Sequence, residues 1–128
     1  MRKAILVIIL AVVTSNAAAA WIEVDRDNVT TIYADPATIR KAGNMVKMWT
    51  MADYRTPRVA NGEQHMSSKS LHEYDCKESR FRDTYVVRHS NNMGGGAMVS
   101  NNPIPSSWVP IPPGTVGEAL MEIACGKR

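Results

Sequence analysis

The sequence predicts an α+β domain: an antiparallel meander sheet of five or six strands, one C-terminal helix packed on it, and a strand-to-helix disulfide. Short runs rich in β-branched and aromatic residues, separated by turn residues, predict the strands. Asn61-Gly62 lies between two such runs, and this dipeptide favours the positive φ angles of a tight hairpin turn. Near the C-terminus, Thr115 and Glu118 have the spacing of a helix capping box.

The first half of the sequence predicts two hairpins, of which the second has its turn at Asn61-Gly62. Residues 21–24 and 29–34 form the first, joined by polar residues. Asp35-Pro36 then predicts a short turn or one-turn helix through Ile39, because proline suits the first helical position. Residues 45–54 are apolar on both faces, which predicts a central strand.

The strands after Asn61-Gly62 predict which side chains share a face. Alternation over residues 65–77 places Cys76 on the face expected to meet the element that carries Cys125. The same alternation over the next strand predicts one cationic outer row, which contains Arg80, Arg82 and Arg88.

The sequence between residues 91 and 113 predicts a loop, a short strand and a connector. The three glycines that end residues 91–96 predict a mobile loop, and residues 97–100 a last short strand. Five prolines in 103–113 predict an extended connector, because proline lacks the backbone donor that a central strand needs.

The C-terminal helix is predicted to end at Gly126. Its apolar positions follow the spacing of one helix face: Gly117, Leu120, Met121, Ala124 and Cys125. Further apolar residues flank that face, so we expect cover on more than one side. A curved sheet or a second subunit, which would make a homodimer, explains this equally well.

Residues 1–20 predict a secretory signal peptide, which leaves residues 21–128 as a single domain. Arg2 and Lys3 precede an apolar run, and small residues follow up to an Ala18-x-Ala20 cleavage pattern. The run is shorter than the roughly 20 residues that a membrane span requires, and no cysteine follows it to accept a lipid. We therefore expect an exported protein, periplasmic, surface-located or secreted, with no membrane span and no lipid anchor.

The charge of the mature chain argues against nucleic acid as a partner. The full chain has 15 Lys and Arg against 12 Asp and Glu, and loss of Arg2 and Lys3 with the leader leaves 13 against 12. A nucleic-acid binder keeps a concentrated basic face, whereas charges of opposite sign alternate here.

The chain has two cysteines, Cys76 and Cys125, and both would enter an oxidising compartment. A bridge between them is therefore predicted; it would close a loop of about 50 residues and stabilise the fold by about 4 kcal/mol. A catalytic thiol would need an adjacent base, and a metal site would need paired ligand spacings.

The histidines and serines of the sequence do not form the motif of a catalytic or metal site. His65, His72 and His89 lack the spacing of metal ligands, and the serines near His72 are not in a G-x-S-x-G nucleophile elbow. We expect no enzyme activity, metal or cofactor.

The best candidates for a partner-binding surface are Arg80, Arg82 and Arg88, since arginine is enriched at interfaces. The alternative is a solvated face that prevents aggregation.

Five landmarks occur together in this order: an N-terminal Trp-x-x-Val strand, YADPATI followed by VKMW, YDCKESRFR, WVPIPPGT and EIACGK. They resemble the bacterial surface-adhesin protein E family over nearly the whole mature chain. The resemblance implies an antiparallel sheet with a helix packed on it, sometimes as a dimer, and a bridge between Cys76 and Cys125. For the best-known member it implies binding of host extracellular-matrix and serum proteins through a segment that corresponds to 74–93.

These observations predict an exported, non-enzymatic protein-binding domain of the cell envelope, with adhesion to a host matrix or serum protein as the leading version. Two alternatives stay open. One is a periplasmic accessory or structural protein whose partner is another envelope protein; the other is a small-molecule-binding domain with a pocket between sheet and helix.

Overall fold

The computed structural model describes residues 20–103 and 105–126, so the predicted signal peptide lies almost entirely outside the described residues. Seven strands, one 3-10 turn and one helix follow each other along the chain. They are β1 (Ile22–Arg26), β2 (Thr30–Ala42), β3 (Met45–Ala60), β4 (Glu63–Asp75), β5 (Arg80–His89), η1 (Asn92–Gly94), β6 (Met98–Asn102), β7 (Val109–Pro110) and α1 (Val116–Cys125).

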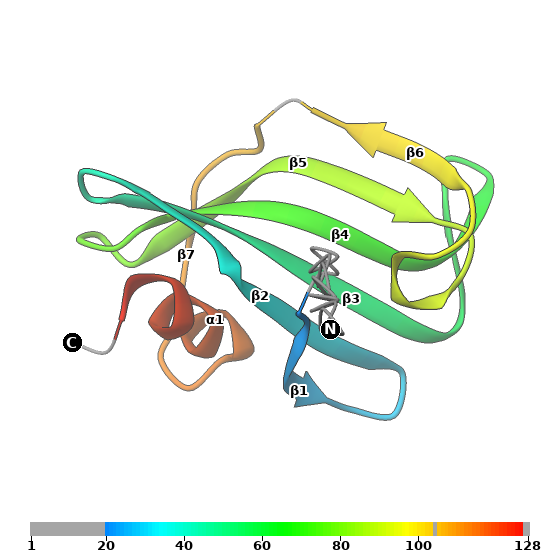
Figure 1. The fold of residues 1–128 in the computed structure, drawn as a ribbon, viewed down its shortest axis with the longest axis horizontal. Coiled ribbons are helices and arrows are strands. Elements are labelled where there is room, and N and C mark those ends of the chain that lie inside the picture. The colour runs from blue at the N-terminus through cyan, green and yellow to red at the C-terminus, as the bar shows by residue number, and fades with distance from the viewer. Residues whose placement is uncertain (1–19, 104, 127–128) are drawn as a thin grey trace, which may run out of the picture.

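The strands form one antiparallel meander (Figure 1). Strands β1 to β6 lie side by side in chain order, and the short β7 adds to the edge of β5. The predicted fold class is confirmed, including the central position of β3 between β2 and β4. No helix among the described residues is long and apolar enough to cross a membrane.

The hairpin between β3 and β4 is confirmed at the predicted turn. Asn61 and Gly62 have φ angles of 52° and 77°, which is the conformation that an Asn-Gly pair adopts at low cost. Strand β3 is longer than the predicted 45–54, because pairing resumes at Arg58 and His65 after an irregularity that follows Asp53. Strand β4 begins and ends two residues earlier than the predicted range of 65–77.

The prediction of a turn or one-turn helix at Asp35-Pro36 is wrong. The chain stays in β2, and the pairing with β3 jumps from Asp35 and Trp49 to Arg40 and Lys47, which makes a bulge. The Thr38 hydroxyl donates to the Asp35 carbonyl at 2.6 Å and accepts the backbone N–H of Trp49 at 3.0 Å. Side-chain hydrogen bonds thus replace the lost ladder bonds, and proline is tolerated because the bulge needs no donor there.

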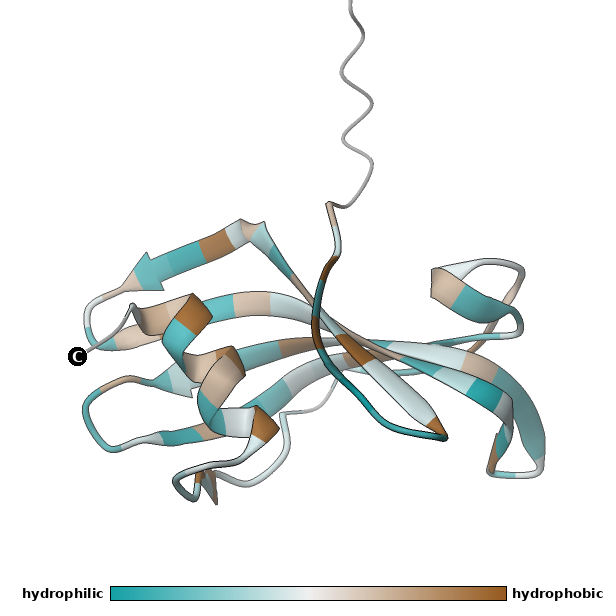
Figure 2. Ribbon diagram, turned by 90° about the horizontal axis from the view of Figure 1, so that it is seen from below, coloured by the Kyte–Doolittle hydropathy of each residue, from teal (hydrophilic) through white to brown (hydrophobic). Residues whose placement is uncertain are grey.

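Helix α1 covers one face of the sheet, which we call the helix face. Its N-cap Thr115 accepts the backbone N–H of Glu118, and Gly126 follows its end with a φ of 85°, as predicted. Figure 2 shows hydrophobic residues at intervals along the helix. The buried core between helix and sheet consists of Ala34, Val46, Met48, Tyr74, Ile111, Leu120 and Ala124.

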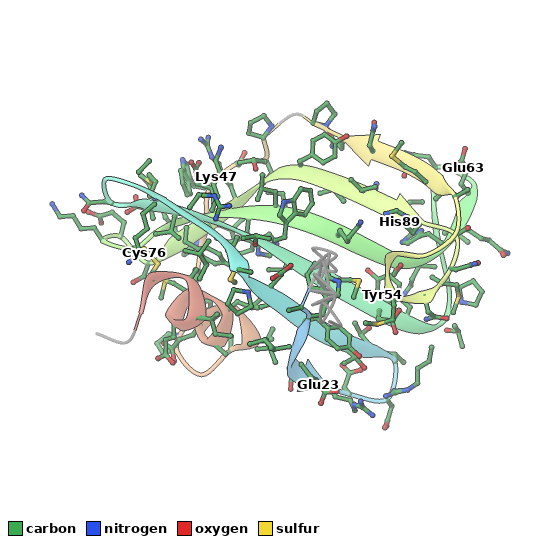
Figure 3. The ribbon with its side chains drawn as sticks, in the orientation of Figure 1. Glu23, Lys47, Tyr54, Glu63, Cys76 and His89 are labelled. Atoms are coloured by element: carbon green, nitrogen blue, oxygen red, sulfur yellow. A yellow bond between two sulfur atoms is a disulfide. The ribbon has the colours of Figure 1, made fainter. Side chains whose placement is uncertain are left out.

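The predicted disulfide joins Cys76, just after β4, to Cys125 in the last turn of α1, with the Cα atoms 5.9 Å apart (Figure 3). The half-buried Met121 and Ile123 of the helix pack against the same core. The sheet of this chain therefore accounts for much of the apolar surface of the helix.

The glycine-containing loop was predicted to be mobile, but it is anchored to the sheet. The backbone N–H of Met93 donates to the carboxylate of Asp53 at 2.8 Å, and that of Gly94 donates to the hydroxyl of Ser67 at 2.9 Å. Ser67, which is fully buried, donates in turn to the carbonyl of Asn91 at 2.6 Å. These polar contacts hold η1 against β3 and β4.

Candidate functional site

The sheet face opposite α1, which we call the outer face, carries aromatic side chains in its middle. Residues directly opposite each other in antiparallel strands lie on the same face, and one such row runs through Trp49, Leu71 and Tyr85. The rings of Trp49 and Tyr85 meet edge to face with their centroids 6.2 Å apart. All three side chains are half-buried.

Arg80 and Arg82 lie next to this row on the outer face. Arg80 pairs with Asp75 at 3.0 Å and Arg82 with Glu73 at 2.7 Å. The two guanidinium groups also lie over the ring of Trp108, 4.7 Å and 4.5 Å from its centroid. Cation–π contacts of this kind fix both arginines beside an aromatic surface.

The carboxylate under Arg80 is held in its ionised form. Burial alone would raise the pKa of Asp75, but the backbone N–H of Glu78, the Arg80 side chain and the Arg80 charge outweigh burial, so the pKa is lowered. An ionised Asp75 keeps Arg80 oriented, because a charged acceptor strengthens the hydrogen bond.

The prediction that Arg88 shares this row is wrong. Leu71 pairs with Tyr85 while His72 pairs with Asp83, so one residue, Thr84, is left over and the alternation of β5 reverses. Arg88 lies opposite Ser68 on the helix face and approaches the hydroxyl of Ser100 at 3.4 Å. The structure thus brings Arg80 and Arg82 together and separates Arg88 from them. The one sequence signal of this irregularity is Asp83, a charged residue that alternates with the aromatic residues Phe81 and Tyr85.

The connector after β6 links the two faces. Trp108 stacks on the arginines of the outer face, β7 pairs with β5 through Val109 and Phe81, and Ile111 is buried in the core of the helix face. The prolines of the connector predicted an extended segment, but no local signal could reveal that Trp108 lies against Arg80 and Arg82.

The helix face holds a chain of polar side chains. The Nδ1 atom of His72 lies 2.9 Å from the hydroxyl of Tyr74, and its Nε2 atom lies 2.9 Å from the carboxylate of Asp83. Burial, and secondly the charge of Asp83, raise the pKa of Tyr74. Its phenol therefore stays protonated at neutral pH, which suits a structural donor and not a nucleophile or base.

The other two histidines are held neutral by their surroundings. Burial lowers the pKa of His65, and the nearby charges of Arg88 and Arg58 lower it further. Burial and the charge of Lys69 lower the pKa of His89 in the same way. Within residues 20–103 and 105–126, no three His, Cys, Asp or Glu side chains form a group that could hold a metal ion.

No curated protein matches the chain at a significant level. A family model, that of surface-adhesin protein E, matches residues 21–126. This span contains every described strand, the helix and both cysteines. The chain therefore belongs to the surface-adhesin protein E family.

Proposed function

We propose that this chain is an exported, non-enzymatic protein-binding domain of the cell envelope, and that its outer face contacts the partner. The leading version is adhesion to a host extracellular-matrix or serum protein. The observation that carries the proposal is the stack of Arg80 and Arg82 on Trp108, next to the Trp49–Tyr85 pair, on the face opposite α1.

The composition of this surface supports a protein partner. Interfaces are enriched in Trp, Tyr and Arg, and these residues also dominate the binding energy of many complexes. The side chains of Arg80 and Arg82 are 41% and 32% exposed, so a partner can reach them. Their rotamers are already fixed by Asp75, Glu73 and Trp108, which reduces the entropy that binding would cost.

Charge supports an acidic contact on the partner. Asp75 and Glu73 already neutralise much of the two guanidinium charges, but arginine has five donors and each of these ion pairs leaves some of them available. A carboxylate on the partner could use the remaining donors without displacing the internal ones.

The test is binding of immobilised matrix and serum proteins by the purified domain, measured by surface plasmon resonance. We expect Arg80→Ser with Arg82→Ser to weaken binding at least tenfold, or about 1.4 kcal/mol. Arg88→Ser is the control, since it removes one arginine charge from the opposite face. Equal loss in the control, or no loss in the double variant, would contradict the proposed surface.

A second pair of variants separates charge from stacking. Replacing Arg80 and Arg82 by lysine keeps both charges but loses the planar fork and much of the stacking on Trp108. If the stack forms the binding surface, the lysine variant and Trp108→Ala will both bind weakly. Full binding by the lysine variant would mean that the two positive charges alone account for binding, without the stack on Trp108.

The compartment decides between the leading version and an envelope partner. Protease treatment of intact cells, followed by fractionation, will degrade the protein if it is on the surface. Protection in the periplasm would remove the adhesin version and favour a role as an accessory protein that binds another envelope protein through the same outer face.

A further inference from the structure

A pocket of about 410 Å³ lies on the helix face, between the sheet, the first turn of α1 and the connector. Its walls are apolar and come from segments far apart in the sequence, among them Ile32, Phe81, Ile111, Val116 and Leu120. The size falls within the range of roughly 300–1,000 Å³ that is usual for small-molecule sites, which are mostly apolar with a few polar groups.

Most polar residues of this pocket lie on the strands at its floor. Thr50, Ser70 and His72 belong to the lining. Thr50 is 4% exposed, yet its hydroxyl lies 3.4 Å from both the Ser70 carbonyl and the His72 Nε2 atom. Such distances are at the weak limit of hydrogen bonding, so this buried hydroxyl would gain from a closer partner supplied by a ligand.

The lining favours an uncharged ligand. Among the residues that the structure describes, the lining includes no Lys, Arg, Asp or Glu side chain, so a charged group would be buried without a counter-ion, which is costly. The carboxylate of Asp83 lies 2.9 Å from the Nε2 atom of His72. Its negative charge would further oppose a carboxylate placed over the floor.

The walls are held in place before any ligand arrives. Pro110 and Pro112 restrict the connector, and the backbone N–H of Ile111 donates to the carbonyl of Ser79 at 3.0 Å. Helix α1 is tied to the end of β4 by the bridge between Cys76 and Cys125. A pre-formed site needs little ordering on binding.

We propose that this pocket binds a small uncharged amphiphile, an apolar chain or ring with one hydroxyl head that hydrogen-bonds to Thr50. The apolar part lies against Phe81, Ile111 and Leu120. This site is separate from the outer-face surface of Arg80 and Arg82, so each can fail without the other.

The direct test is uptake of the neutral fluorescent probe N-phenyl-1-naphthylamine by the purified protein, with competition by three ten-carbon amphiphiles. We expect 1-decanol to displace the probe at concentrations at least tenfold lower than decanoate or decyltrimethylammonium. Equal displacement by all three would overturn the assignment of an uncharged head, and failure of the protein to take up the probe would overturn the pocket.

Gly117 offers a matched pair of variants inside α1. A Cβ atom built on Gly117 would lie 3.5 Å from the side chains of Ile111 and Thr115, which is ordinary contact. Gly117→Ala therefore fits and leaves the pocket open, whereas Gly117→Leu places three more carbons in it. We expect probe uptake to persist in the first variant and to fall at least tenfold in the second; equal uptake by both would overturn the location.

Three further variants keep the test independent of folding defects and of the outer face. Val116 is 36% exposed at the rim, so Val116→Trp can narrow the entrance without disturbing the core, and we expect a similar loss of uptake. Thr50→Val should lower the affinity for 1-decanol several-fold while probe uptake stays. Arg82→Ser should leave both unchanged; a loss there would contradict the separation of the two sites.

Discussion

The two faces of the sheet contain similar apolar residues but use them differently. On the helix face, Met48, Tyr74 and Leu120 are 0%, 1% and 5% exposed and form a continuous core with α1. On the outer face, Trp49 and Tyr85 are only half-buried, although burying an aromatic ring is among the largest single gains available to a fold. Around Trp49 and Tyr85, the sheet therefore separates residues that stabilise the fold from residues available to a protein partner. Farther along β3 the outer face has a buried residue of its own, since Met51 is 1% exposed.

The charges do not follow this division. On the outer face, the partly exposed Arg80 and Arg82 pair with carboxylates whose side chains are only 5% and 12% exposed. On the helix face, the chain of polar groups runs from the buried Tyr74 through His72 to Asp83, whose side chain is 37% exposed. Mutations in the core of the helix face should therefore mainly change stability, and mutations of the exposed arginines on the outer face should mainly change binding of a protein partner.

The largest expected effect comes from the bridge that fixes the helix to its face. Cys125→Ser should lower the free energy of unfolding by about 4 kcal/mol, because the unfolded chain loses the constraint on a loop closed over a sequence separation of 49. Urea denaturation with and without reductant measures the change. Identical curves for the wild type under both conditions would argue against the bridge in solution.

A matched pair of leucines compares the faces directly. Leu120→Ala on the helix face should cost about 3 kcal/mol, because it removes a core side chain and leaves a cavity. Leu71→Ala on the half-exposed outer face should cost about 1 kcal/mol, because less area is removed from contact. Equal losses in thermal unfolding would mean that the outer face is covered in solution.

Acidification should destabilise the fold by a smaller amount. His65 and His89 have lowered pKa values in the folded state, so their contribution is complete above the unfolded value of about 6.5 and is lost as the pH falls below it. We expect the urea concentration at the unfolding midpoint to decrease as the pH is lowered from 7.5 to 5.5. The decrease should be smaller in the double variant His65→Gln with His89→Gln. An unchanged pH dependence in that variant would assign the effect to the carboxylates.

The smallest effect is expected for the ion pairs of the outer face. Arg82→Gln should change the free energy of unfolding by less than about 1 kcal/mol, because its side chain is partly exposed and the pair with Glu73 is screened. Differential scanning fluorimetry in low and high salt will show this. A loss comparable to that of Leu120→Ala would mean that Glu73 cannot tolerate an unpaired charge, and that Arg82 is structural.

Local signals explain what the sequence could predict. The Asn61-Gly62 turn, the cap at Thr115 and the stop at Gly126 each act within a few residues, and the meander follows from joining such elements in order. The bridge followed from there being only two cysteines.

What the sequence missed depends on pairing between distant residues. A single extra residue in β5, opposite Leu71 and His72, reverses the face of Arg88, and no run of alternating side chains reveals it. Asp35-Pro36 has the local chemistry of a helix start, but β3 continues past it and the hydroxyl of Thr38 supplies a bond to that strand. The position of Trp108 against Arg80 and Arg82 likewise needed the full path of the connector.

That path also has a consequence for how copies of the protein behave at high concentration. Strand β5 would otherwise offer a free edge to another chain, yet β7 pairs at Arg80 and Phe81, β6 at residues 86–89, and Ser106 bonds both the N–H and the carbonyl of Asp83 between them. Pro110 also withholds a donor at the rim of this strip. A protein held at high local density during export would thus be protected along this edge from strand exchange and from growth into fibrils.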